Sequence, residues 1–167
     1  VRADYLDILH AELAAGHRRF ADRRERYRPA LREWVELGEA KDTSAIDFAA
    51  AQIRRRESAA VWSDWLAEHR IDALIEPTVP VVAWKRGDGY ERAGSDAALI
   101  AFTHYWNYTG FPAVALPAGA GSCSGLPVGV SLIGAPGTDW ELLGRGIGLQ
   151  AELGVPEAPV PATTAPN

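Results

Sequence analysis

Apolar residues recur every three or four positions in the first part of the chain, which is the spacing of one face of a helix. The repeat is formed by Tyr5, Leu9, Leu13, His17 and Phe20. Pro29 is expected to end this helix, and Gly38 is expected to end a short helix over 31–37. A long third helix, running to about residue 70, has three candidate capping residues, Asp42, Thr43 and Ser44.

After residue 70, short continuous apolar runs replace the helical repeat. Residues 71–76 form such a run and are stopped by Pro77 and Pro80, which predicts a strand that enters a loop. The loop over 77–94 is long for a connector, and long ordered loops are often lids or binding loops.

Two buried strands joined by a turn are the most strongly specified feature of the chain. Residues 107–119 and 125–134 are apolar runs in which Gly and Pro recur, with a Gly- and Ser-rich turn between them. The flanking elements are expected to be a helix over 95–105, a helix over 138–153 and a proline-rich tail, extended or disordered, over 155–167. Helices beside such strands predict an α/β fold.

Composition limits the classes of protein. The 167 residues are 47% hydrophobic and 23% charged, which predicts one globular domain. No apolar run reaches about 18 residues, so no membrane partner is expected. The net charge of −5 gives no reason to expect a polyanionic partner. Cys123 is the single cysteine, which excludes an internal disulfide or zinc set and favours a reducing compartment, the cytoplasm.

Several short patterns are weak candidates for chemistry. The segment 121–125 places Cys123 at the centre of a G-x-nucleophile-x-G pattern, but strand residues follow where a nucleophile elbow needs a helix, so a flexible hairpin turn is expected. His10 and His17 lie seven apart, not at the four-residue spacing of a helical metal pair, so partly buried or surface histidines are expected and no metal.

Two further patterns have a structural explanation. Gly144, Gly146 and Gly148 resemble part of a dinucleotide fingerprint, but they fall inside an amphipathic repeat, so close packing of a helix on a sheet is expected. A locally basic segment contains Arg18, Arg19, Arg23, Arg24, Arg26 and Arg28. Acids three or four residues from several of these arginines predict a solvated helix with weak ion pairs rather than a nucleic-acid surface.

From residue 72 onward, a series of motifs resembles the C-terminal part of the amidase signature family, hydrolases and transferases that act on amide bonds. The motifs are Asp72-Ala-Leu-Ile-Glu-Pro-Thr-Val-Pro80, Phe102-Thr103, Asn107-x-Thr109-Gly110, Pro112-Ala113, Pro117-x-Gly119, Gly125-Leu-Pro-Val-Gly129 and Leu132-Ile133-Gly134. The resemblance implies helices flanking a mixed β-sheet, with residues 1–154 as the C-terminal portion of the domain. Because the chain opens on Val1 inside a helical pattern, it is expected to be the later part of a longer polypeptide.

The same resemblance says where the chemistry lies. In that family a Ser, a second Ser joined through a cis peptide bond and a Lys act together, in a Gly- and Ser-rich segment of the earlier half. Lys41 and Lys85 are the only lysines here, and neither lies in such a segment, so no catalytic residue and no cofactor is expected. The expected partners are the missing N-terminal half of the same fold and, in the full-length protein, a small-molecule amide.

The later half of that family also lines part of the substrate funnel. By this resemblance the substrate-binding residues are expected to be Thr78, Trp84, Thr103, Tyr105 and Asn107. Ile100 stands where the amidotransferases of the family carry an acid for the substrate amino group, which favours an apolar or aryl amide. The alternative is a non-catalytic binding or structural domain that keeps the half-fold without the chemistry.

Overall fold

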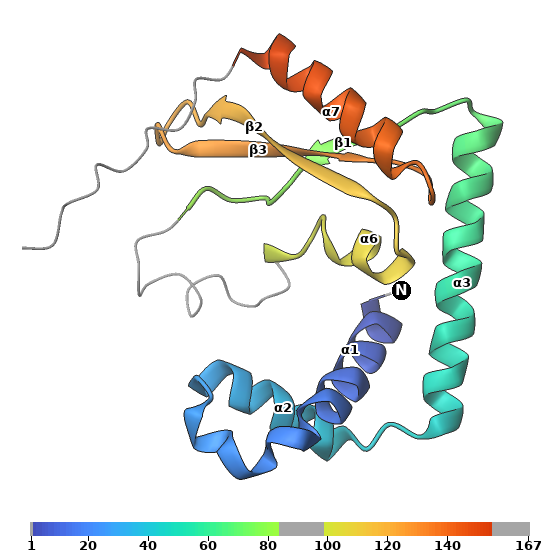
Figure 1. The fold of residues 1–167 in the computed structure, drawn as a ribbon, viewed down its shortest axis with the longest axis vertical. Helices are drawn as coiled ribbons and strands as arrows, with labels where there is room; N and C mark the ends of the chain where they lie inside the picture. The colour runs from blue at the N-terminus through green and yellow to red at the C-terminus, as the bar shows by residue number, and fades with distance from the viewer. Residues whose placement is uncertain (1, 84–98, 155–167) are drawn as a thin grey trace, which may run out of the picture.

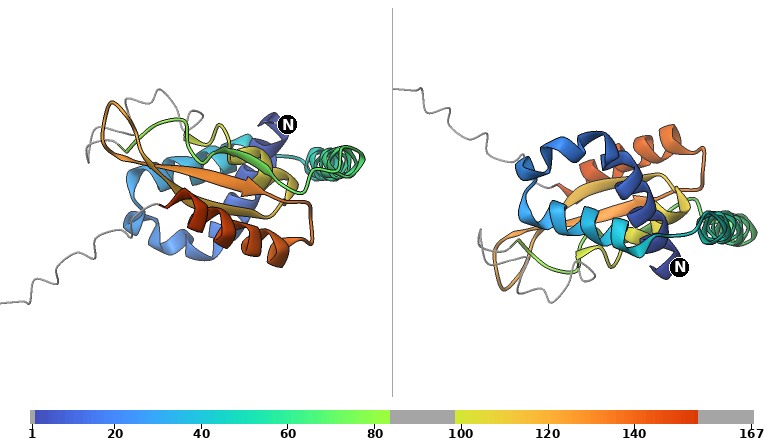
Figure 2. Two further views of the ribbon diagram at one scale, coloured as in Figure 1. Left: turned by 90° about the horizontal axis from the view of Figure 1, so that it is seen from above. Right: turned by 90° about the horizontal axis from the view of Figure 1, so that it is seen from below.

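Helices lie on both sides of a small sheet (Figures 1 and 2). The computed structural model describes residues 2–83 and 99–154. In chain order the elements are α1 (Arg2–His17), the 3-10 helix η1 (Arg18–Arg26), α2 (Pro29–Lys41), α3 (Ala45–Glu68), β1 (Leu74–Pro77), α6 (His104–Thr109), β2 (Ala113–Ala120), β3 (Pro127–Ile133) and α7 (Asp139–Leu153). This arrangement confirms the α/β class.

The basic segment is not a continuation of the first helix, as its apolar repeat predicted. The α-helix ends at His17, and η1 contains non-helical backbone angles at Phe20 and Arg23. Like charges four residues apart oppose an α-helix in such an arginine-rich stretch. Pro29 begins α2 instead of ending the first helix, because the first turn of a helix does not need the missing proline N–H.

The arginines of η1 and α3 find partners across elements rather than three or four residues away. Arg24 pairs with Glu39 of α2, and Arg54 contacts Asp4 of α1 at 2.6 Å. The local pairs in η1 join adjacent residues only, as in the 3.5 Å contact of Arg23 with Asp22. The expected ion pairs therefore exist, but mostly as links between helices.

Gly38 does not end a helix, contrary to the prediction for residues 31–37. It is buried inside α2, and a Cβ placed on it would lie 2.6 Å from the backbone oxygen of His10. The missing side chain lets the α1 and α2 backbones approach each other. The third helix is as predicted, because the Ser44 side chain caps α3 by accepting a hydrogen bond from the Asp47 amide at 3.1 Å.

The sheet has the order β1-β3-β2, and both strand pairs are antiparallel. The mixed sheet expected from the resemblance thus shows only antiparallel pairs among the described residues. The first predicted strand of the pair starts later than residue 107, because α6 continues to Thr109 and Gly110 ends it with a φ of 78°. The hairpin turn is confirmed: the Gly121 amide donates to the Leu126 oxygen at 2.9 Å, and Cys123 is exposed.

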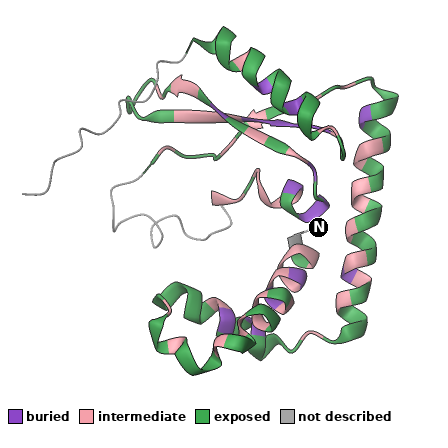
Figure 3. Cartoon of the chain, in the orientation of Figure 1, coloured by how far each residue is buried: buried purple, intermediate pink, exposed green. Residues whose placement is uncertain are grey.

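Two apolar clusters cover the two faces of the sheet. On one face, Leu142 of α7 packs against Leu116 and Leu132. Gly146 permits this contact, since a Cβ there would lie 3.0 Å from Val114, whereas Gly144 and Gly148 have no such neighbour. On the other face the buried residues are Leu66, Trp106, Phe111 and Ile133, which join α3 and α6 to the sheet. Figure 3 shows these buried positions as short stretches among exposed ones.

Some predictions lie outside the described residues. They are the loop beyond Ala83 with Trp84, the start of the helix predicted over 95–105, and the tail over 155–167. Within the described residues, no helix is both long and apolar enough to cross a bilayer. Neither do those residues bring together three His, Cys, Asp or Glu side chains in a way that could hold a metal ion.

Candidate functional site

A polar cluster of Glu76, Thr78 and Ser131 lies on the sheet face that α6 covers. Glu76 and Ser131 are cross-strand partners of β1 and β3, so their side chains leave the sheet on the same side. Thr78 follows β1 directly and extends its pairing, because its amide donates to the Gly129 oxygen at 3.0 Å. The Thr78 and Ser131 hydroxyl oxygens lie 2.9 Å apart. Three oxygen-bearing side chains therefore lie side by side.

Trp106 of α6 completes the cluster. Its indole N–H donates a hydrogen bond to Oε1 of Glu76. The ring is buried among aromatic neighbours, with centroid distances of 5.3 Å to Trp62, 5.2 Å to Tyr105 and 5.6 Å to Phe111. Such packing fixes the orientation of the indole, so the position of the Glu76 carboxylate is fixed as well.

The Glu76 carboxyl group is in an unusual electrostatic environment. Burial raises its pKa, and the Trp106 N–H opposes that shift in part. Among the described residues no charged side chain contributes to the shift. The group is therefore a half-buried acid without a cationic partner in the described part of the chain, which makes it a strong hydrogen-bond acceptor with unused capacity.

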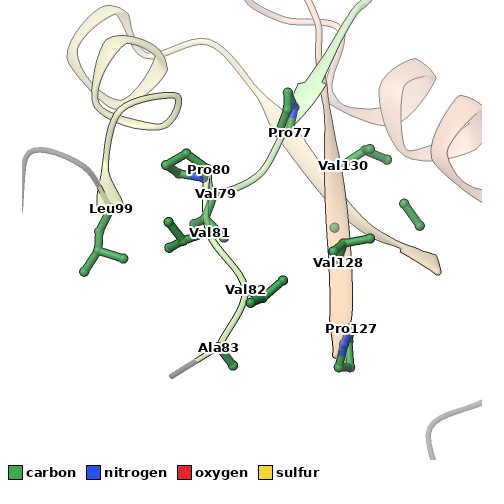
Figure 4. Close-up of a pocket in the computed structure, with 12 residues that line it drawn as sticks. Pro77, Val79, Pro80, Val81, Val82, Ala83, Leu99, Pro127, Val128 and Val130 are labelled. Atoms are coloured by element: carbon green, nitrogen blue, oxygen red, sulfur yellow. The ribbon is translucent and has the colours of Figure 1, made fainter. Parts of the chain in front are cut away.

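An apolar groove of about 580 Å³ begins next to this cluster (Figure 4). Pro77 and Val79, the neighbours of Thr78, both line it. Its other lining residues are Pro80, Val81, Val82, Ala83, Leu99, Ala118, Pro127, Val128, Gly129 and Val130. A groove of this size with apolar walls is typical of sites that take a small apolar ligand.

The structure separates the five residues predicted to contact substrate. Thr78 lies in the polar cluster, and Tyr105 lies behind it, 5.8 Å from Trp62 between ring centroids; burial raises the pKa of its phenol. Thr103 is the half-buried residue that precedes α6. Asn107 is exposed and lines a different, smaller cleft with Tyr5 and Arg55. Trp84, the fifth, lies outside the described residues.

Glu76, Ser131 and Trp106 were not predicted from the sequence. Glu76 did carry a signal, since it is the one acid inside the apolar run 71–76 apart from Asp72 at its start. Trp106 carried none, because an aromatic residue in a short helix is more often a core residue. Its contact with Glu76 joins residues 30 positions apart, which only the fold brings together.

Comparison with known proteins places this architecture in a family. The family model described as Amidase matches residues 4–143. Among curated proteins, the chain is 36% identical over 87 residues to mandelamide hydrolase of Pseudomonas putida, covering 52% of this chain and 17% of that protein. It is 39% identical over 97 residues to the A chain of the glutamyl-tRNA(Gln) amidotransferase from Cenarchaeum symbiosum, covering 56% of this chain and 19% of that one.

Solved structures agree with these matches. An amidase crystal structure superposes with a TM-score of 0.72 at 27% identity, covering 92% of this chain and 35% of that one. A 6-aminohexanoate cyclic dimer hydrolase complexed with substrate gives a TM-score of 0.73 at 27% identity, with 90% and 34% covered. The chain thus spans about a third of the solved relatives and less than a fifth of the curated ones. With the family model matching most of its length, the chain belongs to the amidase family.

Proposed function

We propose that this chain is the C-terminal part of an amidase that hydrolyses a carbon–nitrogen amide bond, and that it is inactive without the rest of the fold. The observation that carries the proposal is the family match over residues 4–143, combined with coverage of only about a third of the superposed structures. The chain would supply sheet scaffold and part of the wall of a substrate funnel.

The described residues support the view that the reactive groups come from elsewhere. Lys41 lies at the end of α2 and pairs with Asp7, so it shares no hydrogen bond with a described serine. Ser131 is buried and is held by Thr78. Cys123 is exposed in the hairpin turn, where its one hydrogen-bond contact with a described residue is to the neighbouring Ser122. An activated nucleophile needs a base within reach, and in the described part of the chain none of these residues has one.

Exposed apolar surface supports a partner that completes the fold. On α3, Ile46 is 81% exposed and Val61 is 67% exposed, and on α7 Trp140 is 83% exposed. In the sheet, β1 and β2 each have a neighbour on one side only among the described strands. Unpaired strand edges and large exposed apolar residues are features that proteins normally cover. The N-terminal half of the same fold is the partner we propose for these surfaces.

The groove and the polar cluster support a small-molecule amide as the substrate. The groove would hold the apolar or aryl part of the amide, while Thr78, Trp84, Thr103, Tyr105 and Asn107 remain the proposed substrate contacts. Ile100 is an aliphatic residue, so the position gives no charge to bind an α-amino group.

The proposal is tested with the full-length polypeptide that contains this chain and with the 167-residue chain alone, each assayed on a panel of aliphatic and aryl amides. The full-length protein is expected to release ammonia or amine, and the chain alone is expected to release none. Thr78→Val and Trp84→Ala are expected to lower kcat/KM, with Tyr27→Phe as the control because Tyr27 bonds to His17 far from the groove. Full-length protein that is inactive on every amide would contradict the assignment.

The rival proposal is a non-catalytic binding or structural domain. It requires the 167 residues to be a stable monomer that melts cooperatively and binds no hydrophobic dye. Aggregation or dye binding by the isolated chain, reversed by adding the N-terminal half, would favour the amidase proposal instead.

A further inference from the structure

Glu76 destabilises the fold more than a neutral residue would at its position. Its carboxyl group is half-buried, and within the described residues the hydrogen bond it accepts comes from Trp106. Partial burial disfavours the charged form of a carboxyl group unless a cation or several donors compensate, and the described residues provide no cation. Residues that cost stability in this way are concentrated at functional sites.

The second oxygen of the carboxylate is the part available for binding. Oε2 of Glu76 has no hydrogen-bond partner among residues 2–83 and 99–154, and it is not among their fully buried, unsatisfied atoms. The Thr78 and Ser131 hydroxyls bond to each other rather than to Glu76. On the same sheet face, strand alternation places Ala113 and Ala115, which are exposed and small and leave space beside the carboxylate.

We propose that Glu76 determines substrate specificity: its Oε2 accepts a hydrogen bond from a cationic amine carried by the amide substrate. The inference rests on the proposed amidase function and adds a substrate class to it, amides that bear a second, basic nitrogen. The apolar body of such a substrate would occupy the groove beside Pro77, and its ammonium group would reach Glu76. Trp106 is a positioning residue that holds the carboxylate in place through Oε1.

This chemistry fits the position better than an α-amino group does. An ionised carboxylate forms its strongest hydrogen bonds with cationic donors. The ammonium group would be held at the Glu76 end of the groove while the scissile amide lies elsewhere, so the two nitrogen atoms of the substrate need not be neighbours. An amine at the end of an aryl or alkyl substituent satisfies both conditions.

The test compares two amides of nearly equal shape in the full-length enzyme, 4-(aminomethyl)benzamide and 4-ethylbenzamide, which differ in an ammonium against a methyl group. Wild type is expected to prefer the first in kcat/KM. Glu76→Gln is expected to reduce that preference about 10- to 100-fold, since a hydrogen bond to a charged group has that effect. Asp72→Asn removes a nearby, exposed carboxylate that pairs with Arg145 at 3.2 Å, and it is expected to leave the preference unchanged.

A second measurement does not depend on a variant. Benzylamine is expected to inhibit the wild-type enzyme competitively, and ethylbenzene is expected to inhibit much more weakly. Equal kcat/KM values for the two amides in wild type, or a preference that Glu76→Gln leaves intact, would overturn the inference while the amidase function stands. Absence of hydrolysis on every amide of the panel would overturn the proposed function, and this inference with it.

Discussion

Gly38 lies where the backbones of α1 and α2 are in direct contact, so replacing it with alanine tests how tightly these helices are packed. The added Cβ would lie 2.6 Å from the His10 oxygen and 3.3 Å from the His10 carbonyl carbon. These are backbone atoms inside a helix, so the clash cannot be relieved by rotating a side chain. The oxygen contact is about 0.8 Å inside ordinary van der Waals distance, and α2 has to move away from α1.

Two opposing effects set the size of the change. Alanine is favoured over glycine inside a helix by about 1 kcal/mol. Overpacking a close contact costs about 1–3 kcal/mol, and a clash with backbone belongs at the upper end of that range. The net loss in the free energy of unfolding is therefore expected to be about 2 kcal/mol. For a chain of this length that lowers Tm by roughly 4–8 °C.

Gly144→Ala is the matched control, because Gly144 lies in α7 and no atom lies within 4 Å of its added Cβ. That variant is expected to gain about 0.5–1 kcal/mol from helix propensity alone. Thermal melts followed by circular dichroism, together with guanidinium titrations, measure both changes. If Gly38→Ala is stabilised as much as Gly144→Ala, the α1 and α2 backbones are not in contact, and the explanation of Gly38 is wrong.

Three further outcomes are expected. Burial, together with Lys41, lowers the pKa of His10 below 6.5, so His10 favours folding fully above that pH and this contribution is lost as the pH falls through 6.5 toward the folded-state pKa; His10→Phe is expected to flatten the pH dependence of Tm in that window. Burial raises the pKa of Glu76 above 4.5, so its charge opposes folding at neutral pH; Glu76→Gln is expected to be more stable there, with the difference from wild type closing as the pH falls toward 4.5, and a less stable variant would contradict this. Leu66, 2% exposed in the cluster with Trp106 and Ile133, is expected to cost about 2–5 kcal/mol when changed to alanine, and Leu143→Ala, at an exposed position, much less in the same guanidinium titration.

Strand and helix patterns predicted most of the element order correctly, because local spacing and capping act within a few residues. The cap at Ser44, the hairpin around residues 121–125 and the last helix are examples. The errors at Pro29 and Gly38 have a common cause. Proline and glycine can end a helix, but they can also begin one or allow two helices to touch, and only the neighbouring element decides between these roles.

The candidate site was less accessible to sequence reasoning. Thr78 was chosen from its motif, and it does lie in the polar cluster. Asn107 belongs to the same family motif, but it lines another cleft, because α6 extends to Thr109 and turns that residue toward α1. Glu76 and Trp106 were missed because neither is unusual in its own segment of the chain.

Local patterns and the order of short motifs were enough to establish the class of fold, the family and the lack of a Ser-cis-Ser-Lys segment, and all three can be read along the chain. Which side chains meet depends on the three-dimensional fold. Glu76 acquires its raised pKa and its bond to Trp106 because antiparallel pairing with β3 sets its direction and α6 covers that face of the sheet. Burial and hydrogen bonding are properties of that contact, and residues 30 positions apart carry no local trace of it.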